Sequence, residues 1–89
     1  MIKRNDLEKT LKALANRRRL AILKLLRDNK ELTVGELAER INLSFKSTSR
    51  HLSVLSYSEI VQKEQRGLEM YFSLSQTQKL ASKHILSIL

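Results

Sequence analysis

The chain of 89 residues contains no cysteine, no proline and only two glycines. Without cysteine it forms no disulfide or thiolate metal site and has no cysteine nucleophile. Scarce glycine and absent proline favour helices joined by short connections. The longest apolar run, Leu20–Leu23, stops at Lys24 and is too short to cross a membrane. The N-terminus turns polar without the apolar stretch of a signal peptide, so we expect a cytoplasmic protein of one domain, residues 1–89.

Acidic residues are also few. There are 9 Asp and Glu against 17 Lys and Arg, which gives a formal charge of +8 and a pI of about 10.2. Such a balance is typical of nucleic-acid binders, because Lys and Arg that neutralise phosphates release counterions. Net charge describes association rather than fold, so a basic domain without a nucleic-acid partner stays possible at this point. The order of secondary-structure elements has to decide.

Two helices are expected before residue 30. Asp6 can cap a helix over about 6–15, whose leucines recur at helical spacing. Asn16 can cap a second helix that is apolar around much of its circumference. A helix of that kind is buried on more than one side, so we expect it at the centre of the fold.

The next two helices form a helix-turn-helix over about 33–57. Thr33 and Glu36 have the spacing of a capping box, which begins a short third helix. Ser44 can cap a fourth helix from about Phe45 to Tyr57. Two helices of this length joined by three or four residues are the helix-turn-helix arrangement. The inward stripe of the fourth helix is Thr48, Leu52 and Leu55.

After residue 59 the apolar period changes from that of a helix to that of a strand. Alternating apolar positions over about 60–74, with a turn near Arg66 and Gly67, predict a β-hairpin. A last helix is expected over about 76–89. The predicted fold is mainly α (α+β), a winged helix-turn-helix with the order α-α-α-α-β-β-α, the hairpin being the wing.

The outer face of the fourth helix is cationic and hydroxylic. Residues 44–58 hold Lys46, Arg50 and six serines but no acid, whereas ordinary exposed helices mix Glu with Lys. A solvated face is the plainer interpretation, but we favour contact with double-stranded DNA in the major groove. The candidate groove contacts are Lys46, Ser47, Ser49, Arg50 and Ser53, with Thr33 and Ser44 for phosphates at helix N-termini and Lys63, Gln65 and Arg66 on the wing.

Phe45, at the start of the fourth helix, has two interpretations. Phe45 either contacts a thymine methyl group or packs against the third helix, and packing is slightly favoured.

Together the helix-turn-helix and wing patterns resemble the ArsR-type (arsenic-repressor family) winged-helix transcriptional regulators. The resemblance covers residues 7–75 and rests on 11–26, 31–38, 43–55 and the wing. Glu59 stands where that family often has glycine, which leaves the end of the fourth helix open.

The resemblance implies a homodimer, built on the first and last helices, that represses transcription at a two-fold-symmetric operator. The residues agree, because Ile85–Leu89 holds four large aliphatic side chains that one small domain can hardly bury. The alternative is a last helix that lies on its own core. The expected interface, on helices over about 6–15 and 76–89, comprises Leu7, Leu11, Leu14, Leu80, Ile85, Ile88 and Leu89.

Metal sensing is not expected, although many proteins of the resembled family sense metals. Thr33 and Gly35 stand at the thiolate positions of the family's Cys-Val-Cys site, and residues 70–89 contain no acid beside His84. We therefore expect no metal and no other cofactor. Without a Gly-rich phosphate loop, paired carboxylates or a histidine with an acid partner, the sequence does not indicate an enzyme.

Three consecutive arginines open the second helix, where cations oppose the helix dipole. Arg19 is expected in a structural ion pair, while Arg17 and Arg18 could face either an acid such as Glu8 or Asp28 or a DNA phosphate. The alternative function is a winged-helix module that binds an acidic protein partner. Single-stranded nucleic acid is disfavoured because the four aromatic residues form no stacking platform.

Overall fold

Side-chain caps begin three helices at the residues that the sequence predicts. The Asn16 side chain accepts hydrogen bonds from the backbone N–H groups of Arg18 and Arg19. Thr33 and Glu36 form the reciprocal capping box. Ser44 Oγ accepts from the backbone N–H of Ser47 at 3.1 Å. These caps fix where the second, third and fourth helices start.

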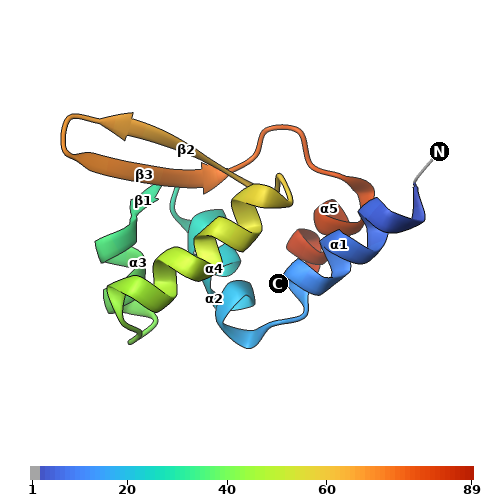
Figure 1. Ribbon diagram of the computed structural model, residues 1–89, viewed down its shortest axis with the longest axis horizontal. Coiled ribbons are helices and arrows are strands. Elements are labelled where there is room, and N and C mark those ends of the chain that lie inside the picture. The colour runs from blue at the N-terminus through green and yellow to red at the C-terminus, as the bar shows by residue number, and fades with distance from the viewer. Residues whose placement is uncertain (1–2) are drawn as a thin grey trace.

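The computed structural model describes residues 3–89 and confirms the winged-helix order (Figure 1). The helices and strands pack with a wing at one end and the first and last helices at the other. In chain order the elements are α1 (Arg4–Leu14), α2 (Arg17–Asp28), β1 (Leu32–Thr33), α3 (Val34–Arg40), α4 (Phe45–Tyr57), β2 (Val61–Arg66), β3 (Glu69–Leu74) and α5 (Leu80–Ile88).

The predicted starts of the two terminal helices are wrong. α1 begins at Arg4 with Lys3 at the N-cap position, so Asp6 lies in the first turn, where it still favours the helix dipole. α5 begins only at Leu80. The preceding segment is a loop because the Gln78 side-chain amide donates to the carbonyls of Ile60 and Ser75, both at 2.9 Å.

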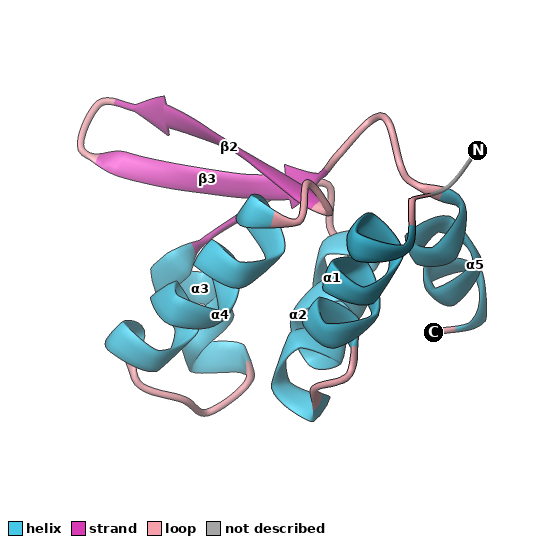
Figure 2. Cartoon of the chain, turned by 45° about the vertical axis from the view of Figure 1, so that its right-hand side comes forward, coloured by secondary structure: helices cyan, strands magenta, loops and turns pink. Residues whose placement is uncertain are grey.

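The wing is part of a three-stranded antiparallel sheet with the strand order β1-β3-β2. The two-residue strand β1, which the sequence did not predict, pairs Leu32 with Phe72 and Thr33 with Tyr71. β2 and β3 pair from Val61 with Leu74 to Arg66 with Glu69, which leaves a two-residue turn. Gly67, at the first turn position, has φ +60°, a backbone conformation that favours glycine. Figure 2 shows this hairpin extending beyond the helices.

α3 and α4 both end in a left-handed residue that is not glycine: Asn42 has φ +54° and Glu59 has φ +61°. In each case the next residue donates back to the last turn, Leu43 to the Ala38 carbonyl and Ile60 to the Leu55 carbonyl. This is the Schellman arrangement. The Schellman arrangement ends α4 at Tyr57, and the left-handed Glu59 turns the chain towards the wing.

The core gathers around α2, as the sequence predicts. Ile22 and Leu23 of α2 are completely buried together with Leu37 of α3 and Leu52 and Leu55 of α4. Since α4 is packed through these leucines and Thr48, its polar face has to point outward. No helix among residues 3–89 has the length and apolar content needed to cross a membrane.

Candidate nucleic-acid interface

The outward face of α4 carries unpaired cations. Lys46, Arg50 and Ser53 are exposed, and Ser47 and Ser49 are half-buried beside them. No carboxylate within residues 3–89 lies within 4.0 Å of either cation. Both side chains are therefore free to meet an anionic partner. A helix that is anchored by its inner leucines and presents such a face can enter a major groove about 12 Å wide.

The expected packing of Phe45 against α3 is at most partial, because 63 % of its surface is exposed. It lines one side of a groove of about 270 Å³ with Val34 at the start of α3 and Leu68 and Met70 of the wing. The core at this end of α4 is already closed by Thr48, so an aromatic ring at the first helical position has nowhere to go inward. Phe45 is thus an exposed aromatic ring between the start of α3 and the wing.

The ion pair expected for Arg19 is wrong. Its guanidinium donates to the carbonyls of Lys12 and Ala13, at the end of α1, and lies 3.2 Å from Nδ1 of His51 on α4. Burial, with smaller effects from the charges of Arg19 and Arg18, lowers the pKa of His51. The ring is therefore neutral near pH 7 and can accept from Arg19. Arg19 joins three helices through these contacts.

Arg17 and Arg18 precede Arg19 in the first turn of α2, and the charge of Arg18 is close enough to His51 of α4 to contribute to its lowered pKa. Neither acid considered from the sequence pairs with them: Glu8 lies 3.8 Å from Lys12, and Asp28 lies 3.1 Å from Arg27. Arg17 is exposed, and Arg18 is half-buried. The first turn of α2 thus carries two cations without a carboxylate partner within residues 3–89.

The wing carries less free positive charge than the sequence suggests. Arg66 donates to both oxygens of Glu31 at 2.7 Å and also pairs with Glu64. Its guanidinium lies 4.5 Å from the centre of the Tyr71 ring. Hydrogen bonding from Arg66 lowers the pKa of Glu31, so the pair is ionised at neutral pH. Lys63 is exposed and has no such partner within residues 3–89, while the Gln65 amide donates to the Gly67 carbonyl.

The structure does not bring Thr33 to this surface. Its side chain is buried, and its hydroxyl accepts from the Glu36 backbone N–H in the capping box. Ser44 is exposed at the start of α4, although its hydroxyl is engaged in the cap. Among residues 3–89, no three His, Asp or Glu side chains come close enough together to hold a metal ion.

The terminal helices lie side by side at the end opposite the wing (Figure 1). Leu80 and Ile88 of α5 are 71 % and 66 % exposed, and Leu11 of α1 is 48 % exposed. Leu7 is half-buried, and Ile85 and Leu89 are partly packed on the core. The prediction that Leu14 lies in the dimer interface is wrong, because Leu14 is 5 % exposed within the protomer's own core and offers no surface to a partner.

Comparison with known proteins agrees with this geometry. The family described as "Bacterial regulatory protein, arsR family" matches residues 16–63. The transcriptional activator HlyU of Vibrio cholerae is 42 % identical over 76 residues, which cover 85 % of this chain and 69 % of that protein. The transcriptional repressor SdpR of Bacillus subtilis is 36 % identical over 66 residues, which cover 74 % of this chain and 72 % of that protein.

Solved structures give the same result. Reduced HlyU from Vibrio cholerae superposes with a TM-score of 0.81 at 36 % identity, covering 96 % of this chain and 85 % of that one. The homodimeric winged helix-turn-helix DNA-binding domain of a possible ArsR-family regulator from Mycobacterium bovis superposes with a TM-score of 0.80 at 25 % identity, covering 94 % and 74 %. The fold, the site and these matches together place the chain in the arsR family of bacterial regulatory proteins.

Proposed function

We propose that the protein is a homodimeric regulator of transcription that binds a two-fold-symmetric operator in double-stranded DNA. The observation that carries the proposal is the outward face of α4, which holds Lys46 and Arg50 without a neighbouring acid. Residues 1–89 act as one DNA-binding unit, with the helix-turn-helix over about 33–57 and the wing over about 60–74. The relatives named above include an activator and a repressor of transcription.

In this proposal α4 lies in the major groove. Arg50, with Lys46, Ser47, Ser49 and Ser53, meets base edges and adjacent phosphates. Phe45 gives an apolar contact at the start of the helix, suited to a thymine methyl group. The cations of Arg17 and Arg18 and the Ser44 end of α4 meet phosphates and hold the protein in register.

A second copy, paired through α1 and α5, completes the DNA-binding surface. Pairing covers Leu11, Leu80 and Ile88, which would otherwise stay in water. A two-fold dimer carries twice the charge of one chain, +16, and sets two α4 helices about 34–36 Å apart, one turn of DNA. Repression follows if the operator overlaps a promoter, because the bound dimer then occupies DNA that the polymerase needs.

Selection of bound DNA from a random duplex pool tests the proposal. We expect an enriched palindrome whose half-sites are centred about one helical turn apart, and binding that falls steeply with salt. A module that binds an acidic protein partner instead would enrich no sequence. Failure to bind duplex DNA at low salt would overturn the proposal, and an enriched site without symmetry would overturn its dimeric part.

The wing provides a prediction of its own. Glu31→Gln removes the bidentate partner of Arg66 and leaves Glu64 as its one described carboxylate partner, so the guanidinium can turn more easily to a phosphate. We expect DNA affinity to rise about 2- to 5-fold and the salt dependence to steepen by up to about one unit of slope. Fluorescence anisotropy with labelled DNA over a range of salt measures both.

The matched control for the wing is Glu39→Gln, which removes an exposed carboxylate from α3 without touching Arg66. It should give a smaller gain, since only the net charge changes. The double variant Glu31→Gln/Arg66→Gln should lose the gain. Equal gains in both single variants would mean that net charge, rather than release of Arg66, governs the wing.

A further inference from the structure

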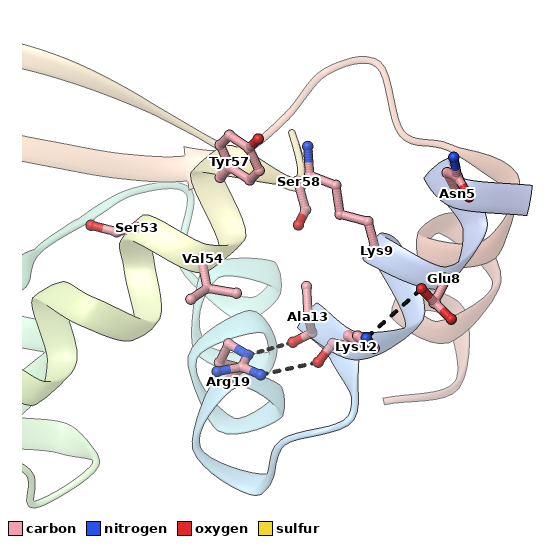
Figure 3. Close-up of a pocket in the computed structure, with 10 residues that line it drawn as sticks. All are labelled: Asn5, Glu8, Lys9, Lys12, Ala13, Arg19, Ser53, Val54, Tyr57 and Ser58. Atoms are coloured by element: carbon pink, nitrogen blue, oxygen red, sulfur yellow. Dashed lines mark hydrogen bonds and ion pairs between the residues drawn. The ribbon is translucent and has the colours of Figure 1, made fainter. Parts of the chain in front are cut away.

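A groove of about 500 Å³ separates α1 from the C-terminal half of α4 (Figure 3). Lys9, Lys12 and Ala13 line it from α1, and Ser53, Val54 and Tyr57 line it from α4. Arg19 closes one end, where it holds the carbonyls of Lys12 and Ala13 (Figure 3). The volume lies within the range of sites for small molecules, about 300–1,000 Å³.

The α4 side of the groove is apolar and exposed. Tyr57 keeps 76 % of its surface in water, and Val54 is also exposed although its neighbour Leu55 is fully buried. Ala13 lies at the base of the opposite wall but is 1 % exposed, so the apolar surface open to a ligand comes from Val54 and Tyr57. An exposed valine and an exposed aromatic ring on one wall offer a flat apolar ligand a surface from which it displaces water.

The charge of the groove is positive. Lys9, Lys12 and Arg19 stand against a single carboxylate, Glu8, which lies 3.8 Å from Lys12. Lys9 has no carboxylate partner within the described chain, and its ammonium instead lies 3.6 Å from the centre of the Tyr57 ring. Arg19 is engaged only with neutral groups, the two carbonyls and His51. Two cations in excess beside an apolar wall are complementary to an organic anion.

We propose that this groove binds a small aromatic carboxylate. Its ring packs against Val54 and Tyr57, and its carboxylate pairs with the ammonium groups of Lys9 and Lys12. The ammonium of Lys9 moves from the Tyr57 ring to the carboxylate, so the ligand takes the place that Lys9 now covers.

Binding in this place also affects the proposed function. α1 belongs to the proposed dimer and α4 to the proposed DNA surface, so a ligand wedged between them alters the angle of α4 within the dimer. This regulatory step rests on the proposed function, whereas the binding of the anion does not. The bound anion would then be the regulatory signal in a chain that has no cysteine and whose residues 3–89 hold no cluster of metal ligands.

The test uses naphthoate and its neutral analogue naphthamide as probes, titrated into the full chain and followed by two-dimensional NMR. We expect saturable shifts that are confined to the groove faces of α1 and α4. The affinity of naphthamide should be lower than that of naphthoate by about 5-fold or more, because naphthamide lacks the charge that pairs with the lysines. Lys9→Gln should lower the affinity for naphthoate by about 5- to 10-fold and leave the affinity for naphthamide unchanged.

Lys24→Gln is the matched control, since Lys24 is an exposed lysine of α2 that does not line the groove. It should leave both probes unchanged. Equal binding of the two probes, insensitivity to Lys9→Gln, or absence of saturable binding at millimolar probe would overturn the proposal.

Operator binding separates this failure from that of the proposed function. Without probe, Lys9→Gln should bind DNA as the unaltered protein does, with the same salt slope. With saturating naphthoate, operator affinity of the unaltered protein should change by about 5-fold or more, and that of Lys9→Gln should change less. A reduced salt slope in Lys9→Gln would assign Lys9 to DNA phosphate and overturn the ligand site alone.

Discussion

Leu80→Asp is expected to convert the dimer to monomers and to lower affinity for a complete palindromic operator by about 100-fold or more. Leu80 is 71 % exposed at the first position of α5, so its side chain contributes little to the protomer's own core. An aspartate there is compatible with the positive end of the helix dipole, which keeps α5 intact. Across a two-fold interface the same substitution buries two unpaired carboxylates, which an apolar contact cannot accommodate.

The size of the effect follows from linkage of the two half-sites. Once one protomer of a dimer is bound, the second meets its half-site at a high effective concentration, which is worth about 10²- to 10⁴-fold in affinity. The monomer loses that gain but keeps α4 unchanged. Sedimentation velocity gives the oligomeric state, and anisotropy compares the full operator with an isolated half-site.

Leu68→Asp is the matched control for the interface. Leu68 is a fully exposed leucine at the tip of the wing, so the chemical change is identical but lies far from α1 and α5. This variant should remain dimeric. If Leu80→Asp also remains dimeric, or if it loses affinity for the isolated half-site as strongly as for the full operator, the interface is not where we place it.

Local sequence patterns were sufficient where the cause of a structure is itself local. Ser44 caps α4, and the spacing of Thr48, Leu52 and Leu55 orients it, so its start and its outer face could be predicted, while Glu59 left its end open. The capping box of α3 is equally local, since it needs only Thr33 and the residue three places on. In these segments the predicted caps and buried residues agree with the structure.

Predictions failed where a residue's partner lies far along the chain. Arg66 meets Glu31 across 35 positions, so its charge looked free in the sequence although two carboxylates hold it. Arg19 was mispredicted for another reason: its carbonyl acceptors lie only six and seven residues away, but no sequence pattern marks a backbone acceptor. β1 is two residues long and exists only because β3 pairs with it, which is too short for a periodic signal.

The dimer surface shows both outcomes. The apolar positions of the terminal helices were visible, but periodicity alone could not say which of them the protomer uses itself. Leu14 packs inward beside α2, whereas Leu11, one turn earlier, faces out. The difference comes from how α1 is rotated by its contacts with α2, α4 and α5, which is a property of the whole fold.

Arg50→Ala is expected to lower affinity for the selected operator by about 1–3 kcal/mol, roughly 5- to 150-fold, and to relax sequence preference at one position of each half-site. Arg50 is exposed near the middle of α4 and has no carboxylate partner within residues 3–89, so its planar guanidinium is free for two parallel bonds to a guanine edge. Arg50→Lys keeps the charge but not that geometry, and should recover affinity for random DNA while staying poor at the operator.

Arg18→Gln makes the comparison decisive, because Arg18 is proposed to contact phosphate rather than a base. It should weaken operator and random duplex by the same factor and reduce the salt slope by about one, without changing the preferred sequence. Anisotropy with both DNAs over a range of salt measures all of these quantities. If Arg50→Ala and Arg18→Gln lose affinity equally for every sequence, then α4 does not read bases through Arg50. The specificity would then have to come from the remaining outward residues of α4 or from the shape of the DNA.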